Sequence, residues 1–244
     1  MTPTNRRRSR SSSRSARRTS RADRPHADGY RPICDPLWST AAIFGAPSRP
    51  DTLLILSAAR SLDTAHLQIE RVRSGLTDIA DGTSPIGSPA GRAAMYAVIG
   101  DAEHAMIALA LVLRVIRKLD RDYDLSVSPP GVVMQKRRLI KRLRDHYSHV
   151  DERAFGLVRK KPDVRAEEAF EFGALLASRK FTDGKVSLKI DADATKLFNA
   201  ARGYLIDAWR ELVEKAVAEH GGSVLAATNW AAAVWASLTG PPAE

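Results

Sequence analysis

Apolar residues recur at steps of three and four along four stretches of the chain, and this spacing predicts four long amphipathic helices. The first stretch follows a proline-rich segment that ends at Pro50, and its predicted inner face comprises Ile55, Ala58, Leu62, Ala65, Ile69, Val72, Leu76 and Ile79. The second has a predicted inner face of Met95, Val98, Ala102, Met106, Leu109, Leu113 and Ile116. Several such stripes in one chain are typical of a helical bundle.

Turn-forming residues set the boundaries of the second and third helices. The Gly, Ser and Pro residues at 82–89 indicate a loop, in which Ser88 is the expected N-cap and Pro89 the first helical residue. The sequence Ser-Pro-Pro-Gly at 128–131 ends the next connection. A third helix is expected from Val132 to Glu152, with an inner stripe of Leu139, Leu143, Tyr147 and Val150.

The C-terminal part combines a β-hairpin with further helix. Alternating apolar residues up to Ile190, after an Asp-Gly pair at 183–184, predict a two-stranded hairpin in an insertion of about residues 168–190. A fourth helix, ending near His220, and a short fifth helix from Ser223 follow it. The fourth helix has an expected inner face of Ala194, Leu197, Ala201, Leu205, Ala208 and Leu212. The predicted fold class is therefore all-α, with four long helices, a short C-terminal helix and a small inserted β-hairpin.

Charge separates an N-terminal tail from the helical domain. Residues 1–31 contain ten Arg and two Asp, which is +8 of the formal net charge of +10. Because the Arg- and Ser-rich segment lacks aliphatic residues, we expect residues 1–50 to be a disordered tail and linker, and residues 51–240 to be one helical domain. The tail is expected to be solvated, to attract nucleic acid loosely, or to act as a transit peptide.

The sequence favours a cytoplasmic protein without a membrane anchor. Cys34 is the single cysteine, so no internal disulfide is available, and no segment has the continuous apolar core of a secretory signal. The uncharged stretch from Ser223 to Gly240 contains several Ser, Thr and Asn residues. We expect it to dock as a terminal helix rather than to enter a membrane.

Candidate chemistry lies near the end of the third helix, at Arg144, Asp145 and His149. An arginine offers a permanent forked charge for phosphate oxygens, and a histidine exchanges a proton near neutral pH. At 100° per residue, Arg144 and His149 lie about 140° apart on the two flanks of the apolar arc, with Asp145 on the outward side between them. His146 projects near the edge of that arc and is expected to have a structural role.

The spacing Arg-x4-His, with a polar residue directly after the arginine, resembles the signature of the HEPN superfamily of helical-bundle proteins. Arg144-Asp145-x3-His149 fits it, and the continuation through Arg153 is similar to uncharacterised bacterial HEPN-like proteins. The resemblance covers roughly residues 51–220. It implies a HEPN-like bundle and a homodimer in which the motifs of two chains meet in a cleft. In many members it implies a metal-independent endoribonuclease activity.

The resemblance also implies roles for the motif residues. His149 would be the general acid/base near the ribose 2′-hydroxyl, Arg144 would stabilise charge on the phosphorane-like transition state, and Asp145 would orient Arg144. RNA would then be the substrate, and no cofactor or metal would be needed. Some members are toxins with a neighbouring antitoxin, often a nucleotidyltransferase, and others are inactive modules that bind only nucleotides or partners.

Three other interpretations stay open. Arg144 and His149 are also compatible with an ordinary solvated face of a basic helix. His146 and His149, joined by Asp101 and His104, would form an incomplete metal site. The basic residues at 136–138 and 141–142 suit either a solvated face or a polyanion track leading to Arg144. Paired cysteines, a phosphate-binding glycine loop and a serine nucleophile motif are missing from the sequence, which argues against redox, nucleotide-hydrolysing and hydrolase activities.

Overall fold

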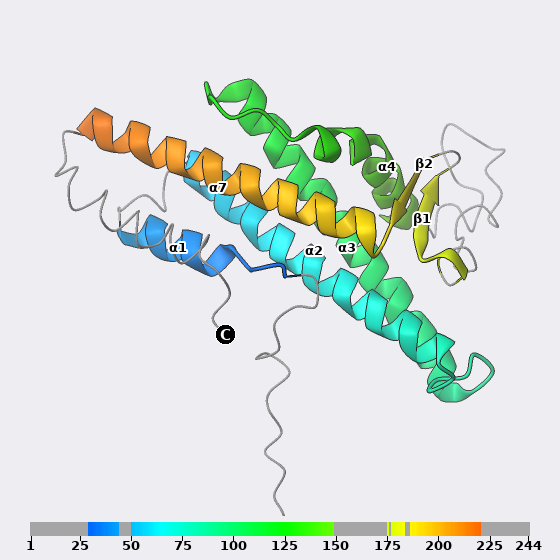
Figure 1. The fold of residues 1–244 in the computed structure, drawn as a ribbon. Helices are drawn as coiled ribbons and strands as arrows, with labels where there is room; N and C mark the ends of the chain where they lie inside the picture. The colour runs from blue at the N-terminus through cyan, green and yellow to red at the C-terminus, as the bar shows by residue number, and fades with distance from the viewer. Residues whose placement is uncertain (1–28, 44–49, 149–174, 176, 184–185, 221–244) are drawn as a thin grey trace, which may run out of the picture.

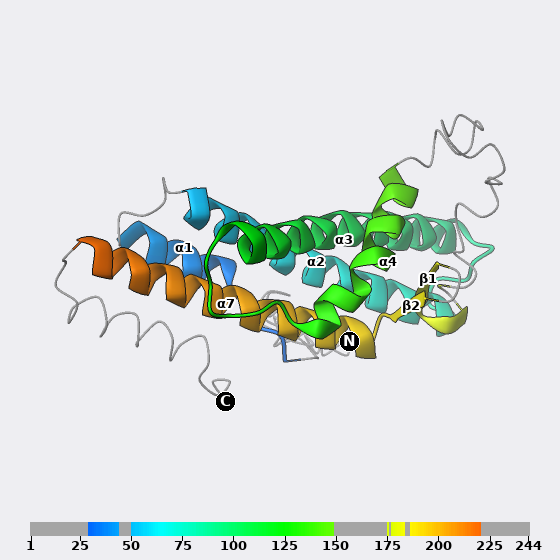
Figure 2. The same ribbon diagram turned by 90° about the horizontal axis from the view of Figure 1, so that it is seen from above.

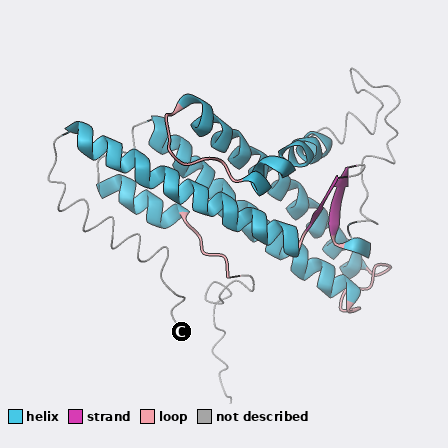
Figure 3. Ribbon diagram, turned by 45° about the horizontal axis from the view of Figure 1, so that its top comes forward, coloured by secondary structure: helices cyan, strands magenta, loops and turns pink. Residues whose placement is uncertain are grey.

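The computed structural model describes residues 29–43, 50–148, 175, 177–183 and 186–220 (Figure 1). Its helices are α1 (Cys34–Ile43), α2 (Pro50–Ala80), α3 (Pro89–Asp122), α4 (Gly131–Ser148) and α7 (Ala192–His220). A two-stranded sheet, β1 (Lys180–Asp183) and β2 (Val186–Lys189), precedes α7 (Figure 3). The all-α fold class with a small β-hairpin is confirmed.

Helices α2 and α3 form the central pair of the bundle. All eight predicted inner residues of α2 are buried, and so are those of α3 except Met95. The two helices approach closely at Gly75, where an added Cβ would lie 2.5 Å from Cγ2 of Val98. Half of the apolar stretch of α3 is buried inside the bundle, so this helix, although long and apolar enough to cross a membrane, serves as a core helix.

The start of α3 follows the predicted capping chemistry. The Oγ of Ser88 accepts a hydrogen bond from the backbone N–H of Gly91 at 2.9 Å, and Pro89 occupies the first turn. Gly91 lies so close to the preceding loop that an added Cβ would be 1.9 Å from the carbonyl oxygen of Pro85. The loop at 82–89 is thereby held against the first turn of α3.

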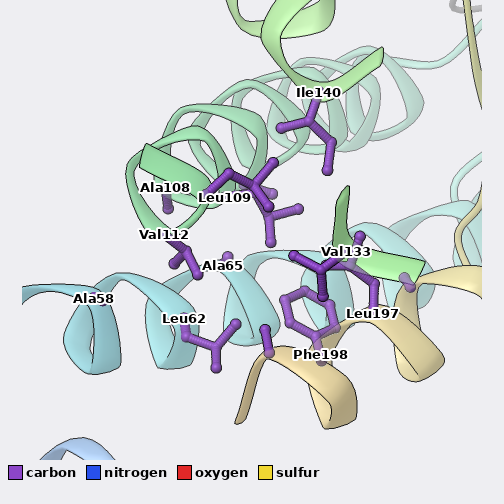
Figure 4. Close-up of a cluster of buried hydrophobic side chains, with 14 of the residues drawn as sticks. Ala58, Leu62, Ala65, Ala108, Leu109, Val112, Val133, Ile140, Leu197 and Phe198 are labelled. Atoms are coloured by element: carbon purple, nitrogen blue, oxygen red, sulfur yellow. The ribbon is translucent and has the colours of Figure 1, made fainter. Parts of the chain in front are cut away.

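Helices α4 and α7 complete the core. All six predicted inner residues of α7 are buried, and Figure 4 shows side chains from α2, α3, α4 and α7 meeting in one cluster. In α4 the predicted Leu139 and Leu143 are buried, and Val133 and Ile140 join them. Figure 2 shows α4 crossing α3 steeply instead of running alongside it.

The hairpin is attached to the bundle through its inner face and through two cations. Phe181 and Leu188 pair across the antiparallel strands and are both buried. Arg73 of α2 donates from Nη2 to the carbonyl oxygen of Ile190 at 2.6 Å, and Lys136 of α4 donates from Nζ to the carbonyl oxygen of Ser187 at 2.7 Å. The hairpin therefore links α2 to α4.

Helix α1 corrects the expectation that residues 1–50 form only a tail and linker. Asp63 of α2 accepts hydrogen bonds from the backbone N–H groups of Ile33 and Cys34 at 3.0 and 2.8 Å, and from the Tyr30 hydroxyl at 2.6 Å. The Tyr30 ring stacks on His66 at a centroid distance of 4.0 Å. The carboxylate thus caps the N-terminus of α1 and fixes this segment on the bundle.

Several predicted features lie outside the described residues. These are the Arg-rich part of the tail at 1–28, residues 184–185 of the hairpin turn, the end of the third helix beyond Ser148, and the fifth helix from Ser223.

Candidate functional site

The structure brings Arg144 and Asp145 together in the last turns of α4. Arg144 donates a hydrogen bond from Nε to Oδ1 of Asp145 at 2.9 Å, and its Nη2 also contacts that oxygen. The side chain of Arg144 is about one-quarter exposed, at 27%. His149, the other half of the motif, and the side chain of His146 lie outside the described residues.

Arg144 is one of seven cations that line a cleft between α3 and α4. The cleft has a volume of about 420 Å³, is partly open to solvent, and has Ala110 and Leu113 as its apolar lining. Among the described residues no carboxylate lines it. The cations are Arg114, Arg117, Lys118 and Arg121 from α3 and Arg137, Lys141 and Arg144 from α4.

Helical spacing explains why these cations form two facing walls. On α3 they occupy positions i, i+3, i+4 and i+7, and on α4 positions i, i+4 and i+7, so each set follows one face of its helix over roughly 10 Å. Each stripe borders the buried face of its helix, which includes Leu113 on α3 and Ile140 on α4. Packing α4 across α3 therefore sets the two basic stripes on either side of one cleft.

Asp122 partly neutralises one end of the α3 wall. Lys118 donates from Nζ to Oδ2 of Asp122 at 2.6 Å, and Arg121 donates from Nη2 to the same oxygen at 2.9 Å. The hydrogen bonds from Arg121 and Lys118 hold the pKa of the Asp122 carboxyl well below its usual range. These two cations are thus paired, as Arg144 is paired with Asp145.

Four cations of the cleft have no such partner among the described residues. In the described part of the chain, no side-chain hydrogen bond or ion pair involves Arg114, Arg117, Arg137 or Lys141. Like charges one helical turn apart destabilise a helix by about 0.2–0.5 kcal/mol per pair. Residues 32–244 together carry a net charge of only +2, so this concentration of unpaired cations is local. Such a concentration of positive charge is suited to bind an anionic group.

Sequence reasoning identified the α4 side of the cleft and missed the α3 side. The basic run ahead of Arg144 predicts either a solvated face or a polyanion track. The regular spacing of four basic residues on α3 is visible in the sequence but predicts no site: these are Arg114, Arg117, Lys118 and Arg121. That spacing alone is common on solvated helices, and its meaning depends on the crossing of α3 by α4.

Only two residues of the alternative metal site, Asp101 and His104, have described side chains, because those of His146 and His149 lie outside the described residues. The described residues contain no group of three His, Cys, Asp or Glu side chains that would hold a metal ion. His104 is exposed, and its Nδ1 lies 2.7 Å from the carbonyl oxygen of Gly100 on its own helix. Asp101 is instead 3.9 Å from the guanidinium of Arg71.

Comparisons with models of protein families, with curated proteins and with solved structures find no match for this chain.

Proposed function

We propose that this protein is a HEPN-type, metal-independent endoribonuclease that holds RNA in the α3–α4 cleft and cleaves it beside Arg144. The observation that carries the proposal is the position of Arg144. The arginine of the Arg-x4-His motif lines a cleft with six further cations. A cleft of this charge attracts the phosphates of RNA and brings one of them to the motif.

The chemistry is a transesterification within the RNA strand. His149 accepts the proton of a ribose 2′-hydroxyl, whose oxygen attacks the adjacent phosphorus and displaces the 5′-oxygen of the next nucleotide. Arg144 stabilises the additional negative charge on the phosphorane-like transition state. The hydrogen bond that Arg144 donates to Asp145 restrains the guanidinium. The departing 5′-oxygen takes up a proton from water, and the His149 imidazolium later releases its proton to solvent. The products are a 2′,3′-cyclic phosphate and a free 5′-hydroxyl, and DNA, which lacks the 2′-hydroxyl, is left intact.

A two-fold homodimer with apposed Arg144 faces is part of the proposal. The cleft is partly open to solvent, and a second chain would exclude water from the reacting phosphate. The proposal also includes a cytoplasmic location, expected from the single cysteine and the lack of a secretory signal, and a toxin role with a nucleotidyltransferase antitoxin, which the HEPN resemblance implies.

The test is RNA cleavage by the purified full-length protein in excess EDTA. We expect 2′,3′-cyclic phosphate ends, no cleavage of 2′-O-methylated RNA, and a loss of about 10²- to 10⁴-fold in rate for Arg144→Ala and His149→Ala. His104→Ala, which removes an exposed histidine of α3, should keep wild-type activity. Cleavage that requires a metal ion, or that survives both motif substitutions, would contradict the proposal.

A second candidate function is a non-catalytic RNA-binding module. It is favoured by the same cleft, because seven cations bind a phosphate backbone whether or not His149 acts on it. RNA binding without cleavage in the EDTA assay would support this module.

A further inference from the structure

We infer that the cleft between α3 and α4 is a two-walled track for the sugar–phosphate backbone, and that it binds RNA and DNA alike. This inference deepens the proposed function, on which it rests for the placement of the scissile phosphate beside Arg144. The basic residues of α3 then take part in binding. RNA and DNA bind equally well, and only the cleavage reaction distinguishes RNA from DNA.

The unpaired cations come from both walls. Arg114 and Arg117 lie on α3, and Arg137 and Lys141 lie on α4. Because no carboxylate in the described residues engages them, they can contact phosphate without first breaking an ion pair. A guanidinium also offers two parallel N–H donors to phosphate oxygens. The four side chains therefore supply about four phosphate contacts.

The length and shape of the cleft favour a polymer over a single phosphate group. Each basic stripe spans eight residues of helix, so its first and last residues lie roughly 10 Å apart along the helix axis. The cations face each other across a concave cleft, whereas a membrane surface would suit a flat basic face with apolar side chains at its rim. Two cationic walls along an open cleft match a chain that carries a phosphate at every nucleotide.

The lining chemistry explains why RNA and DNA should bind alike. No aromatic side chain lines the cleft among the described residues, so the bases have no platform on which to stack. Arg and Lys side chains are donors without an acceptor, and they contact phosphate oxygens that RNA and DNA share. Nothing described in the cleft lining is suited to accept a hydrogen bond from a 2′-hydroxyl.

The experiment is a binding titration with a matched control variant. Full-length His149→Ala protein, which prevents turnover, is titrated against labelled single strands of about 20 nucleotides, RNA and DNA of one sequence, at several salt concentrations. The test variant adds Arg117→Gln and Arg137→Gln, one from each wall. The control adds Arg60→Gln and Arg138→Gln, which remove the same charge from exposed positions outside the cleft.

We expect the test variant to weaken RNA and DNA binding equally, by at least about 10-fold at 0.1 M salt, and the control by less than about 3-fold. The slope of log K against log salt should become shallower by roughly 1.4 in the test variant, since each lost contact to a single strand removes about 0.7. Equal weakening in the test and control variants would overturn the track. RNA binding with no DNA binding would also overturn it.

The outcomes separate this inference from the proposed ribonuclease. If binding is as expected but the wild-type protein does not cleave RNA in EDTA, the track is supported and the ribonuclease proposal is refuted. Cleavage by the wild-type protein, with RNA binding unaffected by Arg117→Gln and Arg137→Gln, would refute the track alone. Circular dichroism should show the wild-type fold for each variant and urea unfolding should show no loss of stability, because all four substituted side chains lie at the surface or the cleft wall.

Discussion

Arg144 donates a hydrogen bond from Nε to Oδ1 of Asp145 at 2.9 Å, so the cation of the motif is held by the residue that directly follows it. Neighbours on a helix point in directions about 100° apart, and here the longer arginine side chain folds back to its neighbour's carboxylate. The contact uses the Nε side of the guanidinium and leaves other N–H donors for a phosphate. Asp145 thus acts as a positioning residue for Arg144.

Asp145→Ala should lower the rate of RNA cleavage by about 10- to 100-fold, because a misplaced charge-stabilising group loses much of its effect. RNA affinity should stay the same or increase, since the substitution removes a negative charge near the cleft. Asp145→Asn, which retains the acceptor oxygen, should recover most of the rate. The rates and the Kd values are measured on one RNA, and a wild-type cleavage rate in Asp145→Ala would contradict the positioning role.

Asp63→Ala should lower the free energy of unfolding by about 2–3 kcal/mol, because it leaves the Tyr30 hydroxyl and the N–H groups of Ile33 and Cys34 without their acceptor. Asp78→Ala, at an exposed position of the same helix, should change it by less than about 0.5 kcal/mol. Urea unfolding at neutral pH measures both values. Equal stabilities of the two variants would show that Asp63 does not secure α1.

The stability difference between the wild type and Asp63→Asn should depend on pH. Burial raises the pKa of Asp63 above its ordinary 3.8, against the hydrogen bonds from Tyr30, Cys34 and Ile33. The native state therefore binds this proton more tightly than the unfolded chain. The stabilisation that comes from this more tightly bound proton is fully present below pH 3.8 and is lost as the pH rises through the folded-state pKa, whereas the hydrogen bonds that the carboxylate accepts persist at neutral pH. Urea unfolding across this range should show the wild type losing stability relative to the Asn variant, and a relative gain would contradict the assignment.

Gly91→Ala should destabilise the protein by about 1–3 kcal/mol, because the added Cβ would lie 1.9 Å from the carbonyl oxygen of Pro85 and the loop must move. Gly100→Ala, also in α3 but with open space around its Cα, should instead stabilise the helix by about 0.5–1 kcal/mol. Thermal unfolding of the two variants gives this comparison. If both substitutions stabilised the protein, or both destabilised it, the close approach of the loop to α3 would be contradicted.

Removing residues 1–28 should leave the fold and the proposed dimer intact while weakening RNA binding. These residues contain nine Arg and two Asp, a net charge of +7. The deletion should therefore raise Kd for RNA and make its salt dependence shallower. It retains Tyr30 and Ile33, which belong to the core, whereas a deletion that includes Tyr30 would break its contact with Asp63. Light scattering over a range of concentrations tests the dimer, and a fully active monomer throughout would rule out a shared cleft.

Sequence periodicity predicted the long helices because their burial follows from local spacing. The stripe from Ile55 to Ile79 and that from Ala194 to Leu212 are buried as expected. Periodicity does not predict helix α1, because this helix has only ten residues and contains Pro36. It also depends on a cap supplied by Asp63, some thirty residues away in the sequence. A contact of this kind leaves little signal in a local pattern.

The candidate site likewise has one part that the local sequence predicts and another part that depends on tertiary packing. The motif at Arg144 is a local sequence feature, and so is the basic run that precedes it. Arg114 and Arg117 became part of the site only through the crossing of α3 and α4, since the same residues on an uncovered helix would form an ordinary solvated face. Tertiary packing, which one stretch of sequence does not encode, thus converts two basic stripes into one cleft.

The central claim is that the cleft cations and the motif act on the same RNA strand, and single-turnover cleavage in EDTA tests it most directly. The Arg117→Gln, Arg137→Gln double variant is compared with the wild type over a range of protein concentrations in excess over RNA. We predict that the half-maximal concentration rises by at least about 10-fold while the maximal rate changes by less than about 2-fold, because these residues bind the backbone and do not contact the reacting bond. An unchanged half-maximal concentration, or no cleavage by the wild-type protein, would contradict the account.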